Sequence, residues 1–176
     1  LGDTDTDEAD LLRELVARVR EADPDVIENH NLHGFDLPFL ATRAKILGVS
    51  LDLGRLDGGL RTRPGPRGRK RHTVPGREMI DTLDAVRRHD FAARDLPGHG
   101  LKAVARHFGL ADASREYVPG AKVYEVYRRD PERVRRYARD DVHEAAGVAR
   151  LLGGATFALA RMAPRRYERL ADAGPA

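Results

Sequence analysis

The sequence contains no cysteine, which excludes disulfide bonds and thiolate metal sites. It has no apolar run that approaches the length of a membrane span. It also has no basic leader at its start, where acidic residues stand instead. Internal repeats are absent as well. We therefore expect a cytoplasmic protein with no membrane partner.

Length and charge limit the classes of protein to which the chain can belong. A chain of 176 residues with 41% hydrophobic residues is long enough for one domain with a full core, and wholesale disorder is not expected. The net charge of +3 and the sequence pI of about 9.4 are a mild basic excess. Such an excess permits a nucleic-acid partner without requiring one.

Helical and strand-like patterns are mixed along the chain, which predicts the α/β class. Asp23-Pro24 and Gly48 end the first two helical patterns. Asp130 and Pro131 begin the clearest helix, and Gly153-Gly154 is expected to end it. The first expected helix carries its amphipathic run at residues 11–19, the second follows the turn at residues 34–36, and the others cover residues 101–108, 123–127, 131–152 and 155–170. One expected strand runs from Val26 toward Asn31 and another contains Met79-Ile80 and ends near Leu83, while residues 51–75 form a hairpin or long loop.

The longest predicted helix carries an unusual carboxylate. A helical wheel places Asp141 in the middle of an apolar face, with Asp140 and Glu144 on the polar sides. An unpaired carboxylate on such a face is costly, so it is ion-paired, hydrogen-bonded, at the edge of a cleft or bound to a metal. Tyr137 lies four residues earlier on the same surface, and the two side chains are a usable catalytic pair.

A second polar group stands where the first strand gives way to a helix. Asp36 follows Gly34 and Phe35 and comes just before Pro38. Taken alone, Asp36 is interpreted as a helix N-cap, worth about 1 kcal/mol. The residues around it are more specific than capping requires.

The pattern Asn-x-x-Gly-Phe-Asp-x-Pro-Phe-Leu at residues 31–40 resembles the second exonuclease motif of family B DNA polymerases. Tyr137-x-x-x-Asp141 resembles the third motif, in the tyrosine variant of the DEDD exonuclease superfamily. Residues 76–81, 101–105 and 122–133 resemble the segments that connect these motifs, in the same order. The likeness spans residues 8–152.

The resemblance implies a ribonuclease H-like fold, in which a mixed sheet is flanked by helices. It also implies a proofreading 3′→5′ exonuclease that uses two Mg²⁺ or Mn²⁺ ions about 4 Å apart. Asp36 and Asp141 are then catalytic metal ligands, and Tyr137 orients the attacking water or the phosphate. Asn31 and Phe35 are expected near the terminal nucleotide of a single-stranded or frayed 3′ end of DNA.

One departure from the family affects the expected activity. No Asp-x-Glu, the family's first motif, precedes Asn31. We therefore expect a chain truncated at its N-terminus, without the first strands, and nearly inactive as it stands. Residues 1–153 are predicted to form a partial exonuclease domain, and residues 154–176 a helical segment leading toward a polymerase palm in the same full-length chain. Two alternatives remain open: a non-catalytic nucleic-acid-binding or scaffold domain derived from this family, and a stand-alone nuclease acting on DNA or RNA.

Basic residues crowd the glycine- and proline-rich segment at residues 61–72. One interpretation is a solvated, mobile loop. The other is that Arg67, Arg69 and Arg71 contact the phosphates of a DNA strand. By the resemblance, a hairpin in this region helps to pass the primer end between active sites, and Asp81 and Asp84 are structural rather than catalytic.

Overall fold

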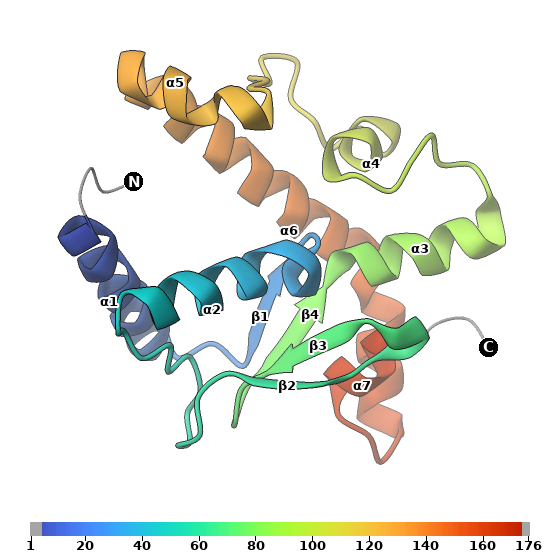
Figure 1. Ribbon diagram of the computed structural model, residues 1–176. Coiled ribbons are helices and arrows are strands. Elements are labelled where there is room, and N and C mark those ends of the chain that lie inside the picture. The colour runs from blue at the N-terminus through green and yellow to red at the C-terminus, as the bar shows by residue number, and fades with distance from the viewer. Residues whose placement is uncertain (1–4, 174–176) are drawn as a thin grey trace.

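The computed structural model describes residues 5–173, whose order of elements can be followed in Figure 1. The N-terminal half contains α1 (Asp5–Ala22), β1 (Val26–Asn29), a π-helical turn η1 (Leu32–Asp36), α2 (Leu37–Ile46), β2 (Arg61–Pro64), the 3-10 turn η2 (Pro66–Gly68), β3 (Lys70–Thr73) and β4 (Glu78–Asp81). The C-terminal half is helical, with α3 (Thr82–Ala93), α4 (Leu101–His107), the 3-10 turn η3 (Gly120–Lys122), α5 (Val123–Arg129), α6 (Pro131–Met162) and α7 (Tyr167–Asp172).

Two pairs of strands form the sheets. β1 runs parallel to β4, with Val26 opposite Glu78 and Asn29 opposite Asp81. Parallel neighbours require a crossover connection, and α2 together with the hairpin supplies it. β2 and β3 form that antiparallel hairpin within residues 61–73. Within residues 5–173, the second edge of β1 pairs with no strand. The predicted α/β class and the predicted hairpin are both confirmed.

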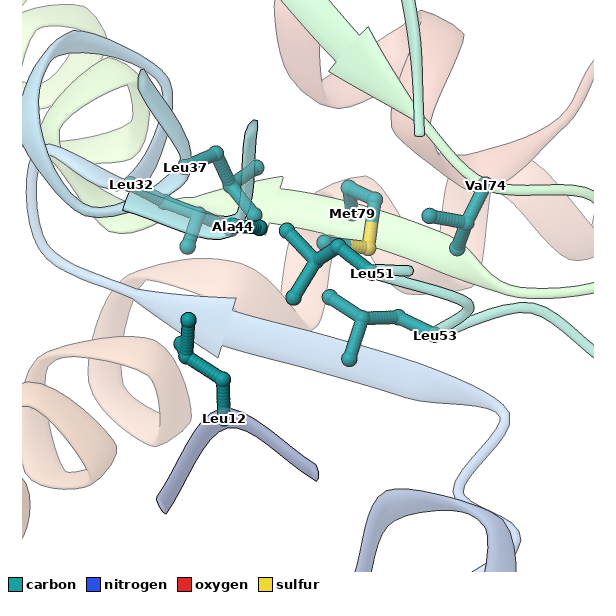
Figure 2. Close-up of a cluster of buried hydrophobic side chains, with 8 residues drawn as sticks. All are labelled: Leu12, Leu32, Leu37, Ala44, Leu51, Leu53, Val74 and Met79. Carbon is teal, nitrogen blue, oxygen red and sulfur yellow. The ribbon is translucent and has the colours of Figure 1, made fainter. Parts of the chain in front are cut away.

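A leucine-rich core fixes the segment after β1 (Figure 2). Leu12 reaches this core from α1, Leu37 from α2 and Met79 from β4. Complete burial of a side chain such as Leu37, which is 1% exposed, contributes about 1.5–3 kcal/mol. The other members of the cluster are Leu32, Ala44, Leu51, Leu53 and Val74. This packing holds η1 in place at the end of β1.

A second core holds the helical half together. Val86 of α3, Val104 of α4 and Val148 of α6 are all fully buried against one another. In Figure 1, α6 lies behind the β1–β4 pair and α2 lies in front of it. The β1–β4 pair therefore lies between α2 and part of α6.

The predicted end of the long helix at Gly153-Gly154 is wrong. α6 continues to Met162, and the helix expected over residues 155–170 is divided between the end of α6 and α7. Glycine inside a helix costs about 1 kcal/mol, which packing can offset. A Cβ on Gly153 would lie 3.3 Å from the Tyr167 hydroxyl, so glycine lets α7 pack close to α6. Although α6 has 32 residues, no helix in the described part of the chain is long and apolar enough to cross a membrane.

Candidate active site

Backbone geometry explains the residue types in the segment after β1. Asn31 adopts a left-handed conformation, with φ 64° and ψ 30°, which asparagine tolerates better than most residues. A Cβ on Gly34 would lie 2.3 Å from the Asn31 Oδ1 atom, so any larger residue here would displace the Asn31 amide. The Asp81 carboxylate accepts the backbone N–H groups of Asn31 at 2.8 Å, Leu83 at 3.0 Å and His33 at 3.2 Å. The predicted structural role of Asp81 is confirmed.

Asp36 stands at the N-cap position of α2, but its side chain does not cap the helix, so the interpretation as a capping residue is wrong. Its side chain makes no capping bond to α2, because the residue already lies in the π-helical turn η1. Asn29 donates a hydrogen bond to its carboxylate, which is half-buried. Burial raises the pKa of Asp36, and the negative charge of Asp81 adds to the rise. The setting holds excess negative charge and suits a cation.

Two aromatic rings flank Asp36 at the surface. Phe35 is 64% exposed and Phe39 is 54% exposed, although both are apolar. Their ring centroids lie 6.1 Å apart with an interplanar angle of 10°, so the rings are stacked. Exposed, stacked aromatic rings can accept a nucleobase on their free faces.

Asp141 faces a buried arginine. The Arg115 side chain is 2% exposed, and its Nε donates to Glu144 Oε1 at 2.6 Å. Its Nη2 donates to Asp141 Oδ1, and its Nη1 lies 3.5 Å from Asp140 Oδ2. One guanidinium thus serves three carboxylates of α6. Among the alternatives for Asp141, this structure contains an ion pair at a partly exposed position.

The helical wheel was wrong about Glu144, which was predicted on a polar side but has a side chain that is 3% exposed. Asp140 lies on a polar side as predicted, with a side chain that is 30% exposed, 3.5 Å from Arg115. Val142, although apolar, is 64% exposed. The buried face of α6 is rotated toward Glu144 because Arg115, from the α4–α5 connection, supplies its charge partner.

Tyr137 and Asp141 share one cation, Arg115, and Tyr137 has a second, Lys102. The Lys102 ammonium donates to the Tyr137 hydroxyl at 2.9 Å, and the Arg115 guanidinium lies 5.2 Å from the Tyr137 ring centroid. Neither Lys102 nor Arg115 was identified from the sequence as a site residue. Lys102 lies in residues 101–105, which were expected only to connect the second and third motifs. Arg115 lies in an irregular loop that no periodic pattern marks.

The structure does not assemble a complete metal centre. Within residues 5–173, no group of three or more His, Asp or Glu side chains could hold a metal ion. Asp36 and Asp141 share no partner among the interactions described above. Asp36 has the chemistry for a hard cation, because it offers carboxylate oxygens and has no ion-pair partner among the described residues. The residues present therefore fit a divalent ion only in part.

The basic hairpin divides into buried and exposed residues. Arg71, predicted to contact phosphates, is 3% exposed and forms ion pairs with Asp84 and Asp172. That burial favours a structural role for Arg71. The Arg69 side chain is 38% exposed and lies 3.7 Å from Asp84, so it remains available to a ligand. The prediction for Arg67 lies outside the described side chains.

Comparison with known proteins identifies relatives of this arrangement. Residues 4–104 match the family described as DNA polymerase family B, exonuclease domain. DNA polymerase 2 of Aeropyrum pernix is 32% identical over 149 residues, which are 82% of this chain and 17% of that polymerase. DNA polymerase 1 of Pyrococcus abyssi is 32% identical over 136 residues, which are 76% of this chain and 17% of that polymerase. The solved family B DNA polymerase of the hyperthermophilic archaeon Pyrobaculum calidifontis has a TM-score of 0.74 and 33% identity, covering 93% of this chain and 21% of that one.

Proposed function

Because the chain belongs to the exonuclease domains of DNA polymerase family B, we propose that it is part of a metal-dependent 3′→5′ proofreading exonuclease. The resemblance seen in the sequence is confirmed, together with the ribonuclease H-like α/β fold class that it implies. The chain spans 17–21% of the polymerases named above. The 3′ end of DNA as substrate and a polymerase palm in the same protein are parts of this proposal.

The half-buried, uncompensated carboxylate of Asp36 is the observation that carries the proposal. It offers oxygen ligands at the end of β1, where the second exonuclease motif stands. Asp141 is the second ligand of this chain: Arg115 engages its Oδ1 atom, and Oδ2 has no partner among the described residues. Two bound divalent ions supply activation of water and stabilisation of charge on the scissile phosphate. A complete two-ion site needs further carboxylate ligands beyond these two, of the kind that an Asp-x-Glu motif supplies.

The other site residues bind and orient the strand. Lys102 fixes the Tyr137 hydroxyl, which orients the attacking water or the phosphate. Phe35 and Phe39 stack on bases near the 3′ end, and exposed Asn31 contacts the terminal nucleotide. Residues 1–153 are assigned to the nuclease domain and residues 154–176 to the connection toward a palm.

A gel assay with labelled single-stranded DNA and Mg²⁺ tests the proposal. We expect little trimming by the 176-residue chain and 3′→5′ trimming by a longer chain that carries the preceding motif. In the longer chain, Asp36→Asn and Asp141→Asn abolish trimming, whereas Tyr137→Phe costs roughly 10- to 1000-fold in rate. Asp57→Asn is the control, since Asp57 is exposed in a loop. Strong trimming by the 176-residue chain contradicts the need for a first motif.

A non-catalytic DNA-binding domain is the second candidate. The engagement of Asp141 by Arg115 favours it, because this cation occupies one oxygen of a proposed metal ligand. The two candidates separate in the longer chain. Binding of single-stranded DNA without trimming, at any Mg²⁺ or Mn²⁺ concentration, identifies the non-catalytic domain.

A further inference from the structure

A cavity of about 480 Å³ lies between the hairpin, η1 with the start of α2, and the start of α3. His33 and Pro38 line one wall, Lys70 and His72 line the hairpin wall, and Arg87 approaches from α3. Cavities of this volume are typical of sites for small ligands. Asp36, Tyr137 and Asp141 do not line it, whereas Asn31 does, so the cavity adjoins the proposed nuclease site without containing its proposed metal ligands.

Cationic side chains dominate the lining. Arg69, Lys70, Arg71 and Arg87 face a single carboxylate, Asp81, which is already occupied by backbone N–H groups. Arg71 is committed to its buried ion pairs, so three cations remain.

Those three cations are only loosely compensated. Arg69 and Arg87 approach the same residue, Asp84, at 3.7 and 3.8 Å. The described residues give the exposed Lys70 ammonium no hydrogen bond or ion pair. An anion in the cavity relieves the mutual repulsion of these side chains.

Two stacked histidines add unsatisfied polar atoms at the cavity wall. His33 is 5% exposed and His72 is 7% exposed, with ring centroids 6.1 Å apart. The backbone N–H of His72 donates to His33 Nδ1 at 3.1 Å, so a neutral His33 ring carries its proton on Nε2. Both His33 Nε2 and His72 Nδ1 are buried, and neither has a hydrogen-bond partner among the residues that the structure describes. His33 lines the cavity, so its unpaired Nε2–H group is a candidate donor to a ligand oxygen there.

We propose that this cavity binds a phosphate group, either of a mononucleotide or of a nucleic-acid strand. A phosphate offers several acceptor oxygens, which can meet Lys70, Arg69 and Arg87 together. The buried His33 N–H group supplies a further donor at the wall. The site goes beyond the proposed nuclease function and does not depend on it, because phosphate binding here requires no hydrolysis.

Binding of inorganic phosphate, thymidine 5′-monophosphate and a fluorescent oligothymidylate by the 176-residue chain tests the proposal. We expect Lys70→Gln to weaken binding about tenfold, the scale of one lost charge-assisted hydrogen bond. Lys122→Gln makes the same charge change at an exposed position near α5 and should leave binding unchanged. Equal losses in both variants would overturn the site in favour of nonspecific attraction.

A second measurement reports the cavity itself. The side-chain Nε2–H resonance of His33, followed by NMR, should move as phosphate or nucleotide is added and should move less in Lys70→Gln. A resonance that stays unmoved at saturation overturns the proposal. The source of the phosphate follows from the oligothymidylate titration. A salt slope that falls by about 0.7 in Lys70→Gln identifies a strand phosphate, whereas an unchanged slope with weakened mononucleotide binding identifies a free nucleotide.

Discussion

Asp36 and Asp141 are both partly exposed carboxylates, yet they lie in opposite electrostatic settings. Asp36 has a neutral donor, Asn29, and a second negative charge, Asp81, nearby. Asp141 has the buried guanidinium of Arg115, which it shares with other acids of α6. The end of β1 therefore carries negative charge that can bind an added cation. In α6, by contrast, the positive charge of Arg115 already neutralises the carboxylates. The difference separates a position suited to a ligand from a position built for stability.

Removing the internal cation should have the largest effect. In Arg115→Met the Glu144 carboxylate stays buried without its partner, and we expect a loss of about 3–5 kcal/mol in the free energy of unfolding. Urea denaturation measures it. Arg133→Met is the control, because its ion pair with Glu116 is largely exposed and should cost less than about 1 kcal/mol. Equal losses would show that the Arg115 cluster is no more important than a surface pair.

Neutralising each carboxylate in turn sharpens the contrast. Asp141→Asn removes one charged hydrogen bond to Arg115 and should lower stability at neutral pH by about 1–2 kcal/mol. Asp36→Asn removes a charge that no cation compensates and should leave stability unchanged or raise it by up to about 1 kcal/mol. Asp57→Asn serves as the exposed reference. The comparison fails if Asp36→Asn is the more destabilising of the two.

A pH series should reveal a smaller effect of Asp36. Burial raises the pKa of this carboxyl above the ordinary value of 3.8, so the folded state holds its proton more tightly than the unfolded state. The protonated carboxyl therefore adds to the free energy of unfolding. This stabilisation is complete below the unfolded-state pKa and is lost as the pH rises through the folded-state pKa. The stability of the wild type relative to Asp36→Asn should therefore fall as the pH rises above about 3.8. A relative stability that rises over this range would reverse the inferred sign.

Local signals in the sequence predicted most of the elements. Asp130 was expected to cap the long helix, and its carboxylate accepts the backbone N–H of Arg133 at 3.0 Å. Asp23-Pro24 was expected to end the first helix, which ends at Ala22. These predictions succeeded because caps and breaks depend on neighbours in the chain. Helix α3, in contrast, was not predicted, since its polar composition obscures a buried face that only Leu83 and Val86 mark.

Contacts distant in sequence were not predictable in the same way. Arg115 and Asp141 are 26 residues apart, and no periodic pattern connects them. The wheel assigned Glu144 to solvent because charged residues are usually exposed, a tendency that a buried arginine reverses. Phe35 illustrates the converse case, since an apolar ring remains exposed beside the proposed site. The burial of Glu144 and the exposure of Phe35 become visible only in the three-dimensional structure.

Helix α6 sets a fixed spacing across the molecule. Its 32 residues form a rod about 48 Å long, with Tyr137 and Asp141 in the first half. Its other end packs on α7, where Asp172 forms ion pairs with Arg63 and Arg71 of the hairpin. The length of α6 therefore sets the distance between Asp141 and the part of α7 that contacts the hairpin.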